Sequence, residues 1–288
     1  MNNIKIAFVV LHYMVTKDTV ECVQSIRKWI DTESYKIVVV ENGSPNNSYQ
    51  ELLEAFDNQE DVVVLHSDTN LGFAKGNNLG FMYAKRELKA EFIVLMNNDI
   101  LLIENGFYSK TVEEYRKSGF AVLGPMVLTA DGRYDSNPLR KKGMSAEDAK
   151  TMRDGLKNKL FFAQHRLERF YVALKKPVDV TAKYRVSNHI ERQENICLHG
   201  CCMIFAKPFI DKFDGLDENT FLYVEEDILY AHLQKAGLKT VYLPGLHIFH
   251  KEDCSTNAVQ QTKKEKRIFI YSHIYQSLQR LIEVLEEK

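Results

Sequence analysis

Short apolar runs alternate with stretches of helical periodicity along the first half of the chain. Each run is uninterrupted and bounded by polar or turn-forming residues, which is typical of strands buried on both faces. Between the runs, apolar residues such as Val20, Val23 and Ile26 recur every three or four positions, which favours amphipathic helices. The pattern predicts strands over residues 4–11, 35–40, 62–65, 92–96 and 120–123, and helices over residues 18–30, 76–88 and 107–117. Because strands and helices of this length alternate, we expect an α/β protein with a mostly parallel central sheet flanked by helices.

The pattern changes after the first half. Residues 131–195 have weak apolar periodicity and many basic residues, and they predict a helical insertion. This insertion is either a solvated surface or a lid that meets phosphate-bearing or membrane-bound material. Residues 196–260 return to an apolar strand, an acidic cluster, a helix and a strand over 240–243, and residues 261–288 form an amphipathic helix. We expect that helix to pack on the protein rather than to anchor it in a membrane, and we place the organisation at 1–130, 131–195, 196–260 and 261–288.

Composition narrows the class of protein. The net charge of −1 gives no electrostatic reason to expect a nucleic-acid partner. No apolar run reaches the ~18 residues of a membrane-spanning helix, and the N-terminal run lacks the small-residue cleavage site of a signal peptide. The five cysteines are odd in number and show no framework spacing, as expected for reduced thiols. We therefore expect a cytoplasmic protein, with peripheral contact at the inner face of a membrane left open.

The strand over residues 92–96 ends abruptly in Asn97, Asn98 and Asp99. Ligands of open α/β sheets collect outside the carboxyl ends of the strands. A carboxylate there is a natural anchor for a hard cation such as Mg²⁺ or Mn²⁺ that bridges phosphates. The alternative is an ordinary polar turn, since Asn and Asp are common turn residues.

Two further polar segments predict a ligand site at the same edge. Glu41 to Ser44 follows a strand, where the carboxylate can accept from a ribose hydroxyl or a base N–H and Gly43 allows close backbone approach. Residues 70–78 form a glycine-containing loop that opens a helix and can present N–H groups to an anion or a base, without the spacing of a Walker A or dinucleotide loop. The candidate donor-binding residues are His12, Glu41, Asn42, Ser44, Asn70, Gly72, Phe73, Gly76, Asn77, Asn97 and Asn98.

Glu225, Glu226 and Asp227 begin a predicted helix. As a structural feature, three acids there are stabilised by the helix dipole. As a functional feature, they supply a general base, and crowding of like charges raises at least one pKa. His250, in the loop after the last strand, is a second candidate metal ligand beside Asp99. The Cys197-Leu198-His199-Gly200-Cys201-Cys202 segment lacks zinc-site spacing and is interpreted as core.

These motifs, taken in order, resemble glycosyltransferase family 2, and in particular its rhamnosyl- and galactosyltransferase-like members of bacterial surface polysaccharide assembly. The resemblance runs from about residue 4 to 255 and rests on Val-Val-Glu-Asn-Gly-Ser, Asn-Leu-Gly-Phe-Ala-Lys-Gly-Asn-Asn, Asn-Asn-Asp, Gly-Cys-Cys-Met-Ile-Phe, Tyr-Val-Glu-Glu-Asp-Ile-Leu and His-Lys-Glu-Asp-Cys-Ser. It implies a GT-A (Rossmann-like) fold and metal-dependent transfer of a sugar, with inversion, from a nucleotide-diphosphate donor to a saccharide or lipid-linked saccharide acceptor.

The resemblance also implies roles for individual residues. Asp99 matches the retained ligand of a degenerate DXD motif, and His250 matches a histidine near the donor diphosphate. Glu41 falls where the family usually has an aspartate that contacts the nucleotide. Glu226 matches the general base, with Asp227 one residue away as the alternative. Two other functions stay open on the sequence: a nucleotidyltransferase that makes sugar nucleotides, and a non-catalytic nucleotide-sugar-binding protein.

Overall fold

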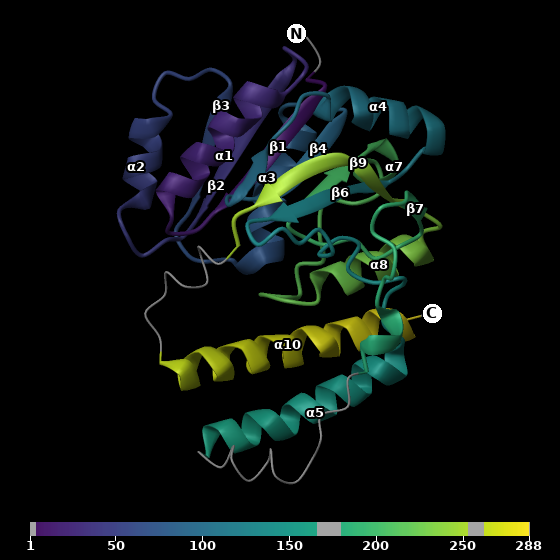
Figure 1. Ribbon diagram of the computed structural model, residues 1–288. Helices are drawn as coiled ribbons and strands as arrows, with labels where there is room; N and C mark the ends of the chain where they lie inside the picture. Colours follow the sequence, from purple (N-terminus) through teal and green to yellow (C-terminus); the bar gives the residue numbers. More distant parts are fainter. Residues whose placement is uncertain (1–3, 166–179, 253–261, 288) are drawn as a thin grey trace.

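A computed structural model of the protein describes residues 4–165, 180–252 and 262–287. Figure 1 shows a sheet with helices on both faces and, below it, two long helices that lie against each other. The strands are β1 (Ile6–His12), β2 (Tyr35–Asn42), β3 (Val62–Ser67), β4 (Phe92–Asn97), β5 (Ile100–Leu102), β6 (Val122–Thr129), β7 (Gln193–Glu194), β8 (Cys202–Phe205) and β9 (Thr240–His250). The helices are α1 (Thr16–Trp29), α2 (Ser48–Ala55), α3 (Gly72–Arg86), α4 (Phe107–Ser118), α5 (Ala146–Gln164), α7 (Lys207–Ile210), α8 (Glu225–Lys235) and α10 (Lys263–Glu286), with a 3-10 turn η1 (Ala182–Tyr184).

The nine strands of the described residues form one sheet in the order β3-β2-β1-β4-β8-β6-β9-β5, and β7 pairs with β9. Strands β1, β2, β3, β4, β6 and β9 run in one direction, and β5, β7 and β8 run against them. This confirms the expected mostly parallel α/β sheet flanked by helices. The antiparallel β8 lies between β4 and β6, so it carries the apolar stretch after Cys197 into the centre of the sheet.

The alternation of side chains along the central strands builds two cores, one on each face of the sheet. In β1, Ile6, Phe8 and Val10 pack into one core, and Ala7 and Val9 pack into the other. Each fully buried aliphatic or aromatic side chain contributes about 1.5–3 kcal/mol relative to exposure. The continuous apolar runs of the sequence therefore reflect burial on both faces rather than a one-sided strand.

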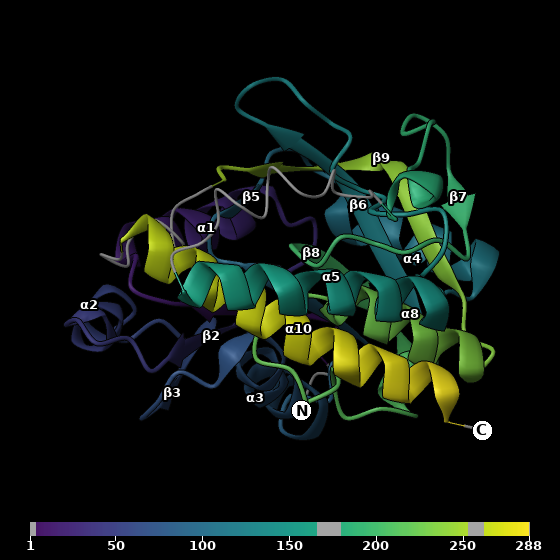
Figure 2. The same ribbon diagram turned by 90° about the horizontal axis from the view of Figure 1, so that it is seen from below.

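A third, smaller core lies outside the sheet, where α5, α8 and α10 meet. It contains Leu156 of α5, Ile228 of α8 and Leu278 and Leu281 of α10. Figure 2, seen from below, shows α10 alongside both α5 and α8, so the predicted C-terminal helix is a packing helix. A capping box formed by Thr262 and Glu265 begins it. No helix in the described part of the chain has the length and hydropathy needed to cross a membrane.

Several boundaries differ from the sequence prediction. The helix expected from residue 76 begins at Gly72, because Asn70 and Asn42 satisfy the backbone at its start. The strand expected over 240–243 continues to His250, because its second half pairs with both β6 and β5. His250 is therefore on a strand and not in a loop. The sequence pattern also missed α2, β5 and β7, which are short and largely follow from tertiary contacts.

Candidate active site

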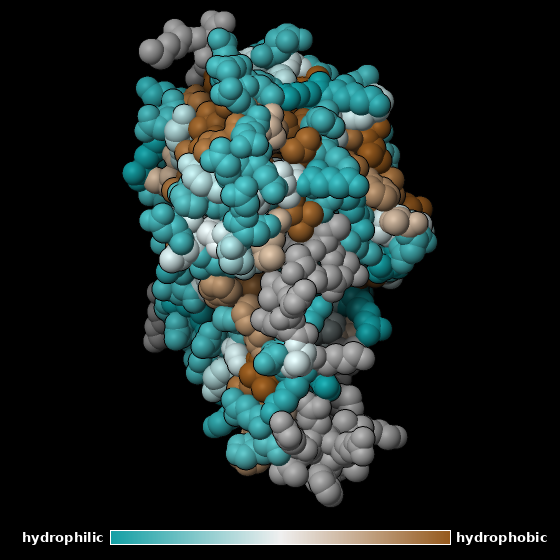
Figure 3. Space-filling model, turned by 90° about the vertical axis from the view of Figure 1, so that its left-hand side faces the viewer, coloured by the Kyte–Doolittle hydropathy of each residue, from teal (hydrophilic) through white to brown (hydrophobic). Residues whose placement is uncertain are grey.

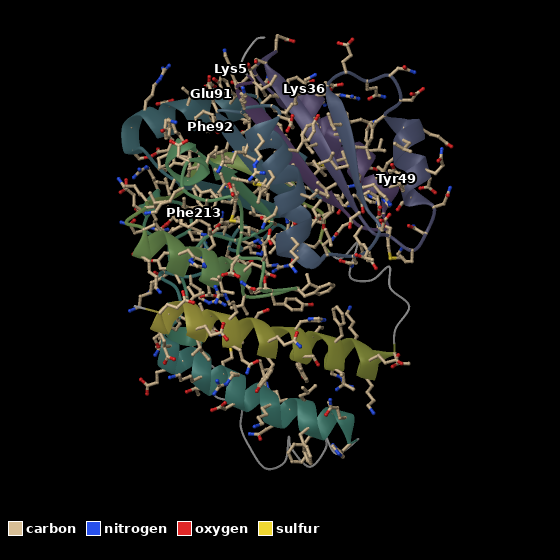
Figure 4. The ribbon with its side chains drawn as sticks, turned by 180° about the vertical axis from the view of Figure 1, so that it is seen from behind. Lys5, Lys36, Tyr49, Glu91, Phe92 and Phe213 are labelled. Atoms are coloured by element: carbon tan, nitrogen blue, oxygen red, sulfur yellow. The ribbon has the colours of Figure 1, made fainter. Side chains whose placement is uncertain are left out.

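The predicted site residues gather at the edge where the parallel strands end. In Figure 4, Lys5, Lys36, Glu91 and Phe92 mark the edge at which the strands begin, and Tyr49 lies towards the other end of the sheet. At that other end, β1 finishes at His12, β2 at Asn42, β4 at Asn97 and β9 at His250. This is the edge at which open α/β sheets bind ligands.

Asp99 and His250 form the first part of the site. Asp99 lies in the turn between β4 and β5, and the pairing of Ile100 with His250 carries the histidine opposite it. His250 Nε2 is 3.2 Å from Asp99 Oδ2, and the backbone N–H of Lys251 donates to the Asp99 carbonyl at 3.1 Å. Asp99 Oδ1 is buried and makes no hydrogen bond in the described structure. A buried carboxylate oxygen without a partner is costly, and it marks a place where a cation or a ligand donor fits.

A carboxylate oxygen and an imidazole nitrogen are suitable ligands for a divalent cation that also binds phosphates. No group of three or more His, Cys, Asp or Glu side chains in the described residues could hold a metal without other ligands. Mg²⁺ in nucleotide sites commonly takes only one or two carboxylates from the protein and the remaining ligands from phosphates and water. The residues therefore fit a cation shared with a phosphorylated ligand.

Lys251 fixes the end of β9 to α1. Its ammonium lies 2.8 Å from Asp18 Oδ1 and also contacts Glu21. Residues 253–261, including the Asp253 and Ser255 of the motif that starts at His250, lie outside the described residues. The ion pairs of Lys251 hold His250 at its position opposite Asp99.

The three acids at the start of α8 have different surroundings. Asp227 is 1% exposed and is bound by Arg140 and by the backbone N–H of Met144 at 3.1 Å. Burial raises the pKa of Asp227 to about 6 while Arg140 opposes the rise, so Asp227 is ionised at neutral pH and occupied by its partners. Burial, aided by the neighbouring charge of Glu226, raises the pKa of Glu225 to about 8, and its Oε1 is buried without a hydrogen bond. Glu226 is half-buried and is the acid of the three whose side chain reaches solvent.

Glu226 lies against the segment that leads into β8. Its Oε1 accepts a hydrogen bond from Gly200 N at 3.2 Å, and a Cβ at Gly200 would lie only 2.9 Å from that oxygen. The neighbouring His199 has its ring centroid 6.4 Å from that of His250. Residues 199 and 200 thus connect the acid of α8 with the Asp99–His250 pair.

The sequence analysis did not identify His199, which lies next to Gly200 and near His250, as a residue of the site. Its Nδ1 accepts from the backbone N–H of Cys201 at 3.1 Å, and burial lowers its pKa, so the imidazole is neutral at pH 7. The cysteines around it, Cys197, Cys201 and Cys202, are buried free thiols, as expected for core residues. The only signal in the sequence was a histidine beside a glycine in an otherwise apolar stretch.

At the ends of β1 and β2, the predicted donor-binding residues mostly bind one another. Glu41 is fully buried, with Oε1 accepting from Ser44 N at 2.8 Å and Oε2 lying 2.7 Å from His66 Nδ1. Both oxygens of Glu41 therefore already have a partner within the protein, and the nucleotide contact that the family resemblance implies stays a prediction. His66, which stacks on Tyr49 at 4.0 Å between ring centroids, is the more exposed member of this group and was missed by the sequence analysis.

His12 and Ser44 lie beside this pair. Burial lowers the pKa of His12 to about 4, although Glu41 opposes the shift, and its Nε2 is buried without a partner. Its Nδ1 is bonded to Thr19 at 2.7 Å. The Ser44 hydroxyl accepts from the backbone N–H of Met14 at 2.9 Å, which joins the loops after β1 and β2.

Some of the predicted asparagines are hydrogen-bonded within the protein, and others keep polar atoms that a ligand could bind. Asn42 accepts from Leu71 N and donates to the Gly72 carbonyl, so it stabilises the start of α3, and Asn70 accepts from Gly72 N. Asn98 donates to Thr19 and to the Val15 carbonyl and is also structural. Asn77 keeps an Oδ1 without a partner in the described structure, and Phe73 and Asn97 are half-buried at the edge, so these residues are left for a ligand, whereas Gly76 is closely packed on Leu11 and Asn42.

The turn that precedes α8, residues 221–224, is strained. Tyr223 and Val224 have φ angles of 72° and 70°, in the left-handed region that L residues with large side chains avoid. Each such residue costs about 1–3 kcal/mol, and the conformation persists only because the surrounding contacts offset that cost. Backbone strain of this kind is concentrated at functional sites.

A family model described as glycosyl transferase family 2 matches residues 8–181. The match covers more than half of the chain, which therefore belongs to glycosyl transferase family 2. Among curated relatives, the low-salt glycan biosynthesis hexosyltransferase Agl10 of Haloferax volcanii is 24% identical over 191 residues, which cover 66% of this chain and 50% of that protein. The glycosyltransferase GlyG of Streptococcus pneumoniae serotype 4 is 32% identical over 120 residues, which cover 41% of this chain and 38% of that protein. The chain thus spans half or less of the curated relatives it matches.

Solved structures show the same fold. Residues 1–349 of TarS from S. aureus superpose with a TM-score of 0.53 at 13% identity, covering 86% of this chain and 60% of that one. GalNAc-T7, solved with UDP, GalNAc and Mn²⁺, superposes with a TM-score of 0.56 at 13% identity, covering 87% and 44%. The fold is therefore that of GT-A glycosyltransferases, as the sequence predicted.

Proposed function

We propose that this protein transfers a sugar, with inversion, from a nucleoside-diphosphate sugar to an acceptor hydroxyl, with Glu226 as the general base. One observation carries the proposal: Gly200 contacts Glu226, and the adjacent His199 approaches His250. This brings an available carboxylate close to a pair of side chains suited to a cation and a diphosphate. Membership of glycosyl transferase family 2 supports the same reaction class.

In this reaction, Glu226 accepts the proton of the acceptor hydroxyl as that oxygen attacks the anomeric carbon. Its carboxylate is oriented by the N–H of Gly200, which leaves Oε2 for the acceptor. The donor lies along the strand ends, with its diphosphate towards Asp99 and His250 and its nucleoside towards His12, Ser44 and His66. Holding donor and acceptor in line supplies much of the acceleration, because no covalent intermediate forms.

Asp99 and His250 would hold a divalent cation, Mg²⁺ or Mn²⁺. When bound, the cation offsets the negative charge that grows on the leaving nucleoside diphosphate. GalNAc-T7, which shares the fold, was solved with UDP and Mn²⁺, and this supports the choice of donor and metal. TarS 1–349, which has also been solved with UDP, superposes with a TM-score of 0.55.

We further propose that the acceptor is a saccharide or a lipid-linked saccharide of a cell-surface polysaccharide. The basic residues of the 131–195 insertion support an anionic acceptor, and Lys141, Lys142 and Lys150 among them are exposed. An acceptor of this kind would bring the protein to the inner face of a membrane. Figure 3 shows one side of the molecule as mostly hydrophilic, with hydrophobic residues gathered in patches.

The experiment is to incubate the protein with UDP-, dTDP- and GDP-sugars and Mn²⁺, and to measure release of the nucleoside diphosphate. Slow donor hydrolysis is expected from a transferase without its acceptor, and NMR of a transferred sugar would give the anomeric configuration. Turnover of a nucleoside triphosphate with a sugar phosphate would instead identify a nucleotidyltransferase. Binding of a sugar nucleotide with no release and no transfer to any acceptor would identify a binding protein.

A further inference from the structure

The strained 221–224 turn is held from two sides. On the first side, the carbonyl of Phe221 accepts from Phe73 N at 2.7 Å, at the start of α3. Gly72 approaches so closely that a Cβ there would lie 2.3 Å from the same carbonyl oxygen, and its φ of 81° also favours glycine. The turn is thereby joined to the helix that faces the donor side of the site.

The second side is the C-terminal helix α10. The Ser277 hydroxyl, which is 1% exposed, donates to the Leu222 carbonyl at 3.0 Å. The ring of His273 stacks on that of Phe221, with 4.7 Å between centroids and 27° between planes, and the ring of Phe269 meets the histidine ring edge-on, with 4.3 Å between centroids. Val224 packs against the core that contains Leu278 and Leu281 of the same helix.

The contacts of the 221–224 turn affect the acids that directly follow it. Glu225 begins α8 directly after the two left-handed residues, and Glu226 is the next position. A turn in a disfavoured conformation relaxes when its contacts are removed, and the direction of the first turn of α8 changes with it. The two cores of the sheet contain no residue of α10, so this relaxation leaves the sheet in place.

We propose that α10, through His273 and Ser277, positions the general base. The proposal rests on the assignment of Glu226 in the proposed function and extends it by making the C-terminal helix part of the active site. His273 and Ser277 are positioning residues: they touch the turn and not the reacting atoms. His273 acts as a flat ring, because burial lowers its pKa and its Nδ1 is buried without a hydrogen bond.

The test compares His273→Ala and Ser277→Ala with Leu285→Ala. Leu285 packs in the same small core but lies eight positions beyond Ser277, about 12 Å further along the helix. We expect kcat to fall about 10- to 100-fold in the first two variants, because a misplacement near 1 Å costs about that factor. The dissociation constant for UDP should stay unchanged, and His273→Phe should recover most of kcat because it keeps the stacked ring.

Amide hydrogen exchange gives a readout that does not depend on turnover. Residues 221–228 should exchange faster in His273→Ala and Ser277→Ala than in Leu285→Ala at matched melting temperature. Equal exchange in all three variants, or a kcat loss in Leu285→Ala as large as in the others, would overturn the positioning role. An inactive His273→Phe would also overturn it, since the imidazole nitrogens would then be required. Faster exchange in a protein that transfers no sugar would contradict only the proposed function.

Discussion

Arg140 binds Asp227 across the start of α8, and this ion pair gives one of the three adjacent acids a permanent partner within the protein. The carboxylate of Asp227 is 1% exposed and accepts a second hydrogen bond from Met144 N. Its partner comes from the loop that also pairs with Cys197, so the pair ties the insertion to the helix that carries the acids. The family resemblance left Glu226 and Asp227 as alternatives, and this contact favours Glu226.

Replacing Glu226 by Gln keeps its size and its hydrogen bond to Gly200 but removes the proton acceptor. We expect kcat to fall by roughly 10²–10⁴ with unchanged affinity for the sugar nucleotide. The measurement is steady-state transfer together with donor binding by calorimetry.

Asp227 provides the matched control, because Asp227→Ala should act on stability. It leaves the partly buried Arg140 without its partner, which lowers the free energy of unfolding by at most about 3–5 kcal/mol. If Asp227→Asn were inactive at full stability while Glu226→Gln stayed active, the base would be Asp227 after all.

Removing the carboxylate at Asp99 should abolish metal-dependent turnover without unfolding the protein. Asp99→Asn keeps the shape and removes a buried negative charge, one of whose oxygens has no hydrogen-bond partner, so the melting temperature should stay the same or rise. Activity is measured against Mn²⁺ concentration after treatment with a chelator. Wild-type response to Mn²⁺ in Asp99→Asn would remove this residue from the site.

The charge state of Glu225 should make stability fall as the pH rises. Burial raises the pKa of this carboxyl to about 8, above the value of about 4.3 expected in the unfolded chain. Between these two values the folded state binds more protons than the unfolded state, so the free energy of unfolding decreases with increasing pH. Glu225→Gln removes this pH-dependent contribution to the free energy of unfolding. The stability of the variant relative to wild type should therefore increase progressively from pH 5 to pH 8. Denaturant unfolding at several pH values measures the difference in free energy of unfolding between the variant and wild type. A difference that does not change with pH would contradict the assignment of Glu225 as protonated.

The contact between Gly200 and Glu226 gives a fourth prediction. Gly200→Ala would place a methyl group 2.9 Å from Glu226 Oε1, so the carboxylate must move and kcat should fall. Gly155→Ala in α5 is the control: its Cβ meets nothing within 4 Å, and alanine in a helix interior should stabilise by roughly 0.5–1 kcal/mol. Measurement of turnover and melting temperature should therefore show a loss of kcat in Gly200→Ala and a higher melting temperature in Gly155→Ala.

The basic surface of the insertion gives the last prediction. Lys141 and Lys142 are exposed, and reversing their charge should raise the acceptor KM and weaken its salt dependence if the acceptor carries a diphosphate. The donor KM should not change. Equal KM values and salt slopes in the variant would leave the insertion as a solvated surface.

Local sequence pattern was sufficient for the parallel strands β1 to β4, and it placed the ends of β1 and β4 to within one residue. The apolar runs around Val9 and Leu95 report burial on both faces, and Asp99 stands out because it follows such a run. Local pattern could not predict which residues distant in the sequence pair with one another. The extension of β9 to His250 depends on β5 and β6, and the capture of Asp227 depends on Arg140, 87 positions away. The same holds for Glu41, whose Oε2 is paired with His66, 25 positions away.

The position of β8 has a consequence for how the chain folds during synthesis. Leu95 of β4 pairs with Met203 of β8, more than a hundred positions later. Until the ribosome has released residues 202–205, β4 presents an unpaired, strongly apolar edge, which is a template for association between nascent chains. Pairings of such long range also slow folding, because a large loop must close before they form. Fragments that end before β8 should therefore aggregate even though they contain the complete β1 to β4 half of the sheet.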